Sequence, residues 1–373
     1  MIAGAGVRYV TSRVAATRPA NEPSRLIDWE RARQVALRVS QWELAGIPDR
    51  AARRAQYARL VDRSEPLIAE YLNVRLPEPI NRVYVVDRRE WLEANFASFK
   101  VLFEPVEQLY EHIGARGSIS SAMGQINGVL VGAQMGILLG FIARRVLGQY
   151  DLSLLSPDPE VRGTLYFVEP NIARVQTQLG LSDEDFRLWI ALHEVTHVFQ
   201  FEAYPWVRPY FNDLLRRFLE QVSSQLEALG VGLPQLLGRL VQGRSSGRHW
   251  IERMLTPEQQ RIFDQLQALM SLVEGYSNHI MNAIGVQLLP SFHLIEQRIQ
   301  QRQQNRPLLE ELFNRITGMD LKLAQYQQGE AFVNAVAAER GVAFVNQVWD
   351  GPEKLPTMAE IREPRRWIAR MGG

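Results

Sequence analysis

The sequence predicts a mainly α-helical protein with a small β element. Apolar residues recur at helical spacing along most of the chain, and only two short runs combine β-branched and aromatic residues in the manner of strands. The predicted strands cover residues 82–86 and 164–168. The predicted helices cover residues 28–46, 50–74, 90–115, 121–147, 182–204, 209–228, 257–284, 292–316 and 328–348.

The composition is that of an ordinary globular protein, with 46% hydrophobic and 22% charged residues in a chain of 373. We expect one integrated domain, with an N-terminal helical region over 1–160 and a second region over 161–373. The formal net charge of +1 provides no basic excess for a nucleic-acid partner. The sequence has no cysteine, which excludes disulfides, thiolate zinc sites and cysteine nucleophiles and fits a cytoplasmic protein.

A long uncharged segment, residues 118–143, covers most of the predicted helix 121–147. Its length would span a bilayer, but Gln125, Asn127 and Gln134 interrupt it and the chain offers no second span. Each interior glycine weakens a helix by about 0.8–1.0 kcal/mol relative to alanine, so close packing must compensate. We therefore expect a helix buried in protein, with a glycine stripe against a neighbouring helix, and no membrane association. The glycines recur every four residues, at Gly124, Gly128, Gly132, Gly136 and Gly140.

Of the two predicted strands, the run 164–168 directly precedes the helix that carries the main motif. By analogy with enzymes that carry the motif of that helix, described below, we expect this run to be an edge strand that holds an extended substrate. The next helix, 182–204, has clear end signals. Ser182 is a good N-cap, acidic residues follow it at the positive end of the helix dipole, and Pro205 lies where the helix should end.

Residues 193–197 of this helix read HEVTH. Residues four apart lie on one helix face, so His193 and His197 can offer imidazole nitrogens to one metal ion. Glu194 follows the first histidine and can reach a water molecule on that metal. The spacing is typical of zinc metallopeptidases, which combine two histidine ligands with a general base.

A catalytic zinc site needs a third protein ligand. A third histidine in the same segment is excluded, because Gln200 and Ala203 stand where that pattern requires Gly and His. The alternative is a glutamate on a later helix, and residues 257–284 provide one. A capping box at Thr256 begins this helix, and we expect Gly285 to end it.

Glu274 is the predicted third ligand, since it lies within an apolar stripe of that helix and a buried carboxylate needs a partner. An ion pair with an arginine of a neighbouring helix is the structural alternative. Asn278 stands where an acidic residue usually accepts a hydrogen bond from a ligand histidine and so orients it, and the Asn278 carbonyl can take that role without adding charge. Candidate oxyanion donors are His279, Tyr276, His249, Tyr204 and Arg208, whereas His112 and His293 are expected to be structural.

Three functions fit this pattern. The leading one is zinc-dependent hydrolysis of a peptide or amide bond in a peptide or protein substrate, with Glu194 as the base. In the second, zinc fastens two helices in a catalytically silent binding or structural protein, and the intact Glu194 argues against this function. The third is a membrane-embedded protease built on 118–143. The sequence carries no signature of substrate specificity or oligomeric state.

Several segments together resemble one bacterial family, the zincin-like metallopeptidases of type 2. They are HEVTHVFQFEAYPW (193–206), EGYSNHIMNAIG (274–285) and GMDLKLAQYQQGEAFVNAV (318–336), joined by 146–152 and 348–356. The resemblance implies a mostly helical zincin-like region over 161–373 with a gluzincin-like zinc site: His193, His197 and Glu274 as ligands and Glu194 as base. The family is also associated with deazaflavin-cofactor biosynthesis, but no residue here argues for binding that cofactor.

Overall fold

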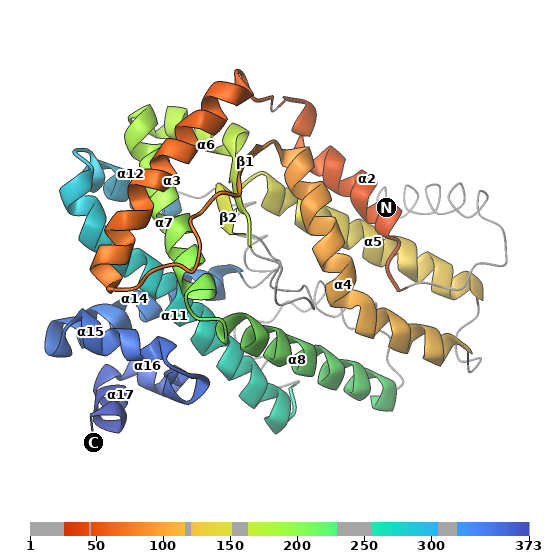
Figure 1. The fold of residues 1–373 in the computed structure, drawn as a ribbon. Helices are drawn as coiled ribbons and strands as arrows, with labels where there is room; N and C mark the ends of the chain where they lie inside the picture. The colour runs from red at the N-terminus through yellow and green to blue at the C-terminus, as the bar shows by residue number, and fades with distance from the viewer. Residues whose placement is uncertain are drawn as a thin grey trace.

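A computed structural model describes residues 26–44, 46–115, 121–150, 163–229, 255–304 and 319–372. The protein is mainly helical with one small sheet, as the sequence predicts (Figure 1). Its longer helices are α2 (Trp29–Ser40), α3 (Arg50–Leu72), α4 (Arg88–Ala115), α5 (Ser121–Ala143), α6 (Glu169–Leu179), α7 (Asp183–Glu202), α8 (Val207–Leu229), α11 (Pro257–Leu288), α12 (Phe292–Gln304) and α14 (Met319–Arg340). Shorter helices follow near the C-terminus: α15 (Val342–Val345), α16 (Met358–Arg362) and α17 (Pro364–Met371).

The sheet contains β1 (Val83–Val86), β2 (Gly148–Tyr150) and β3 (Leu165–Val168) in the order β1-β3-β2. β1 runs parallel to β3, and β2 runs antiparallel to it. The prediction that 164–168 forms an edge strand is therefore wrong, because β3 is central and its apolar residues are buried. The edge strands are β1 and β2, and the one that packs on α7 is β2, whose three residues lack the apolar run that marks a strand in sequence.

Several helices differ from the predicted ones, and in three cases the structure shows the feature responsible. α6 was not predicted; it follows β3 directly, and Gly180, with a φ of 57°, ends it. Gly285 does not end α11, which continues to Leu288; the ring of Phe292 packs where a side chain at position 285 would stand. The predicted helix 328–348 is broken at Gly341, whose φ of 81° is not helical.

The glycine stripe of α5 packs against α2. Side chains at Gly132, Gly136 and Gly140 would collide with backbone carbonyl oxygens of α2, in order along the chain. The two helices therefore run parallel and in close contact (Figure 1), which confirms the prediction of a packed glycine helix. Within the described residues, no helix combines the length and apolarity needed to cross a membrane.

Because α2 and α5 are parallel, their negative dipole ends lie together, and polar side chains bind both. The buried Arg88 donates to the carbonyl oxygens of Ser40 and Gln41 at the end of α2. Asn171 donates to carbonyl oxygens at the end of α5 and accepts a hydrogen bond from Arg88. These contacts join both helix ends to α6, immediately after β3.

α7 runs through the main apolar core and packs between α3 and α11 (Figure 1). Ser182 caps it by accepting a hydrogen bond from the backbone N–H of Asp185, and it ends before Pro205, as predicted. Fourteen of its twenty residues are buried. A second apolar cluster lies among α2, α4 and α5 and meets the sheet at Val86 and Val168.

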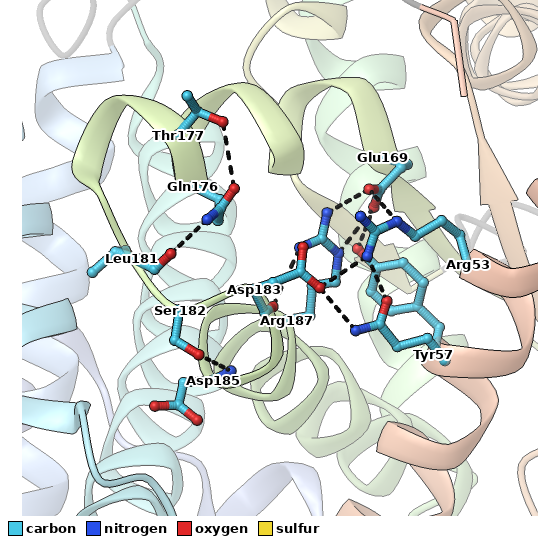
Figure 2. A network of polar contacts seen from close by, with 11 residues as sticks. Arg53, Tyr57, Glu169, Gln176, Thr177, Leu181, Ser182, Asp183, Asp185 and Arg187 are labelled. Atoms are coloured by element: carbon cyan, nitrogen blue, oxygen red, sulfur yellow. Dashed lines mark hydrogen bonds and ion pairs between the residues drawn. The ribbon is translucent and has the colours of Figure 1, made fainter. Parts of the chain in front are cut away.

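A buried ionic network anchors the first turns of α7, as Figure 2 shows. Arg187 is fully buried and forms a 2.5 Å ion pair with Glu169, which is 2% exposed. Tyr57 of α3 donates a hydrogen bond to the same carboxylate, and Asp183 also binds Arg187. The network therefore fixes α7 against α3 and against the end of β3.

Candidate metal centre

The two motif histidines converge on one point. Their Nε2 atoms are 3.2 Å apart on one face of α7. Two nitrogen atoms that bind the same metal ion need such a separation. Burial and the neighbouring His197 lower the pKa of His193 to about 4, against the opposing effect of Glu274. His193 is therefore neutral at pH 7, and its nitrogen lone pair is available to a metal.

Glu274 completes the set from α11. Its Oε2 atom lies 3.7 Å from Nε2 of His193, and the three ligand atoms all lie within 4.8 Å of one another. Tetrahedral zinc, with bonds of about 2.0–2.1 Å, separates its ligand atoms by about 3.3 Å. Two imidazoles and one carboxylate at these separations suit such an ion. Side-chain exposures of 22% for His193 and 20% for Glu274 leave the centre accessible from one side.

Gln200 orients His197, and sequence analysis missed this role. Oε1 of Gln200 lies 2.8 Å from Nδ1 of His197, so the ring donates there and presents Nε2 to the metal. Nε2 of Gln200 donates to the carbonyl oxygen of Val273, the residue before Glu274, at 2.8 Å. Ser277 lies 3.3 Å from the same ring nitrogen. The available signal was position, since Gln200 follows His197 by three residues on one helix face.

Glu194 lies beside the ligands and faces β2. Burial, and then the charge of Glu274, raise the pKa of Glu194 to about 8, while the backbone N–H of Tyr150 donates a hydrogen bond that opposes the rise. A side chain at Gly148 would lie 2.5 Å from Oε1 of Glu194. The carboxylate therefore occupies the space directly against the edge strand, 7% exposed.

Comparison with known proteins assigns the chain to a family. The profile of the zincin-like metallopeptidases matches residues 27–368, nearly the whole chain. The chain belongs to the zincin-like metallopeptidase family. It is also similar to the crystal structure of a candidate hydrolase with a novel fold from Chloroflexus aurantiacus, at 57% identity and a TM-score of 0.71 over 93% of this chain and 99% of that one. No curated protein matches the sequence.

Other residues singled out in the sequence of this zincin-like protein contact different partners. Asn278 donates to Glu330 of α14, while the partners of His197 Nδ1 among the described residues are Gln200 and Ser277. The hydrogen bond to His197 that was predicted for Asn278 is therefore made by Gln200. Asn278 helps instead to hold α11 against α14.

The two predicted oxyanion donors on α11 bind neighbouring helices and are not part of the ligand group. Tyr276 is 1% exposed, and its hydroxyl donates to Asn346 at 2.5 Å. His279 contacts the hydroxyl of Tyr71 at 2.9 Å through Nε2 and Oδ1 of Asn334 at 2.6 Å through Nδ1. Both residues thus tie α11 to α3 and to the C-terminal helices.

The other candidate oxyanion donors and histidines have different surroundings from one another. Tyr204 stacks on Trp349, and burial together with Asp350 raises its pKa to about 12. Arg208 is buried and donates to Tyr150 and Glu202, which places it behind β2. The side chain of His293 is 83% exposed. His249 and the side chain of His112 fall outside the described residues.

Proposed function

We propose that the protein is a zinc-dependent hydrolase of peptide or amide bonds. The observation that carries the proposal is the convergence of His193, His197 and Glu274 around one point beside the carboxylate of Glu194. Three protein ligands with an accessible side are the pattern of catalytic zinc sites, whereas structural sites are closed by four. Membership of the zincin-like family supports the same function.

His193, His197 and Glu274 would hold a zinc ion, whose Lewis acidity would be available to a water molecule and to a substrate carbonyl. The rest of the chemistry belongs to Glu194. A positive charge among the ligands lowers the pKa of this buried carboxyl, so Glu194 is ionised when the reaction begins. Its carboxylate accepts a proton from the water as an oxygen–carbon bond forms, and returns that proton to the leaving nitrogen as the carbon–nitrogen bond breaks.

The position of the edge strand β2 favours an extended peptide as the substrate. The N–H of Val168 donates to the carbonyl of Leu147, so Leu147 and Gln149 direct their backbone groups toward β3. Alternation then turns the backbone groups of Gly148 outward, away from β3, and Glu194 lies next to this residue, where a Cβ atom would stand. An extended backbone is able to pair with such groups and bring its carbonyl beside the metal ligands.

The test begins with metal content per chain in the wild type, Glu274→Ala, Glu194→Gln and the control Glu258→Ala. Glu258 lies in the first turn of α11 and binds Arg217 and Arg261, far from the centre. We expect about one zinc in the wild type, the control and Glu194→Gln, and marked loss in Glu274→Ala. Against a peptide library, Glu194→Gln should retain less than about 1% of wild-type turnover.

Zinc retained in full by Glu274→Ala would refute this ligand set. Full zinc with no hydrolysis of any peptide or amide would favour the second function, a catalytically silent protein in which zinc fastens α7 to α11. Normal turnover in Glu194→Gln would remove the proposed base. Soluble partition after lysis without detergent is expected, in keeping with a cytoplasmic protein.

A further inference from the structure

β2 contacts Glu194 in two independent ways. Tyr150, like Gly148, directs its backbone groups away from β3, and its N–H donates a hydrogen bond to the Glu194 carboxylate. At Gly148 the contact is steric, since a Cβ atom would lie 2.6 Å from both Cγ and Cδ of Glu194. The carboxylate of Glu194 therefore fits into a space that exists because residue 148 has no side chain.

Side-chain contacts hold the Tyr150 end of this short strand in place. The hydroxyl of Tyr150 donates to Glu202 of α7 at 2.5 Å, and Arg208 donates to both groups at 3.1 Å. The Tyr150 ring stacks on Phe201 with centroids 5.7 Å apart. A strand of three residues that pairs with one strand among the described residues is weak by itself, so these contacts determine where its outer edge lies.

On the opposite face, Gln149 binds α4. Its Oε1 accepts a hydrogen bond from the indole of Trp91 at 2.6 Å, and its Nε2 donates to Asn95 at 3.2 Å. The side chains of Gln149 and Tyr150 point to opposite faces of the sheet. β2 is thus held between α4 and the C-terminal end of α7, with its free edge against Glu194.

We propose that β2 is a positioning element for Glu194: the Tyr150 N–H and the bare Cα of Gly148 orient the carboxylate, and the hydroxyl of Tyr150, bound by Glu202 and Arg208, holds the strand at the required place. The inference rests on the proposed function, because orientation matters only if Glu194 transfers protons. Gly148 and Tyr150 are positioning residues that act through Glu194. A displacement of about 1 Å at such a group costs about 100-fold in rate.

The test is amide hydrogen exchange at residue 150, which needs neither zinc nor substrate. An amide on a free sheet edge exchanges quickly unless something accepts its hydrogen bond. We expect protection at residue 150 in the wild type and exchange at least about tenfold faster in Glu194→Ala, in Gly148→Ala and in Tyr150→Phe. Matched controls are Gly46→Ala, where nothing lies within 4 Å of the added methyl, and Tyr84→Phe on the other edge strand.

A wild-type amide that exchanges at the unprotected rate would overturn the proposal, and so would protection that survives Glu194→Ala. Unchanged protection in Tyr150→Phe would remove the hydroxyl from it. Once a substrate is known, zinc-loaded Gly148→Ala should lose kcat at least about tenfold with metal content and KM near wild type. Failure of the proposed function is distinguishable, because a chain without turnover would still show the protected amide.

Discussion

At the scale of the residue, the orientation of His197 depends on a side chain from its own helix and a carbonyl from another. Gln200 accepts from Nδ1 of His197 and donates to Val273 of α11. The second bond fixes which end of the Gln200 amide faces the ring, because only its nitrogen can donate to a carbonyl. One amide therefore aligns a ligand on α7 with the turn of α11 that carries Glu274.

We predict that Gln200→Ala weakens zinc binding by about 10- to 100-fold, the range expected when the partner of a ligand histidine is lost. The affinity is measured by competition with a chromophoric chelator at constant pH. The matched control is Gln34→Ala on α2, where the amide donates to Glu30 at the surface. An affinity equal to that of the control variant would show that the His197 ring is oriented without Gln200.

At the scale of the element, the position of α7 depends on ionic contacts buried at its first turns. The side chain of Arg187 has no solvent exposure, and the carboxylate of Glu169, the residue that follows β3, neutralises its charge. Removing one member of such a pair leaves an unpaired buried charge, which costs more than the pair itself contributes. The network therefore specifies the register of α7 against α3 and the sheet, and through it the height of both histidines relative to β2.

The short C-terminal helices provide a pH-dependent test of stability. Burial raises the pKa of Glu360, but hydrogen bonds from Arg370 and Thr357 outweigh it, so the pKa lies below its usual value of 4.5. A lowered pKa stabilises the folded state above the unfolded-state pKa, and this contribution disappears as the pH falls through the folded-state value. Arg370 is 39% exposed, so solvent screens the pair and its contribution is about 1 kcal/mol.

We predict that Glu360→Gln lowers the free energy of unfolding by about 1 kcal/mol at pH 7, and that the difference disappears as the pH falls below 4.5 and through the lowered pKa of Glu360. Urea unfolding of both proteins across this pH range measures it. Glu363→Gln serves as the control, since Glu363 pairs with Arg366 at 60% exposure and should change little. A difference that persists at low pH would mean that packing of the side chain, not its charge, stabilises α16 and α17.

At the scale of the whole molecule, the candidate ligands come from two parts of the core. His193 and His197 lie on α7, which packs on α3 and the sheet, and Glu274 lies on α11, which packs closely on α14. Gly275 and Gly329 meet at that crossing, where side chains would collide with the opposite backbone. The position of Glu274 is therefore set by a helix pair formed far from the motif in sequence.

Zinc should stabilise the whole molecule, because the folded state presents all three ligands together and the unfolded chain does not. At a free concentration 100 times its Kd, zinc adds about 2.7 kcal/mol. We predict a higher Tm in zinc, a lower Tm after chelation, and little zinc response in Glu274→Ala. Differential scanning calorimetry of the two proteins measures this, and an equal zinc response in both would contradict a ligand role for Glu274.

The sequence by itself determined the helical class, two strands, the glycine contact of α5 and the placing of the candidate ligands His193 and His197 on one face of α7, because each depends on periodicity, capping or spacing within one segment. It also indicated Glu274, as a carboxylate within an apolar stripe. Only the tertiary structure decided that β2 is the edge strand beside α7, that Gln200 holds His197 and that Gly148 faces Glu194. These facts depend on contacts between segments distant in sequence, and no local pattern of residues encodes which side chain of one element meets which group of another.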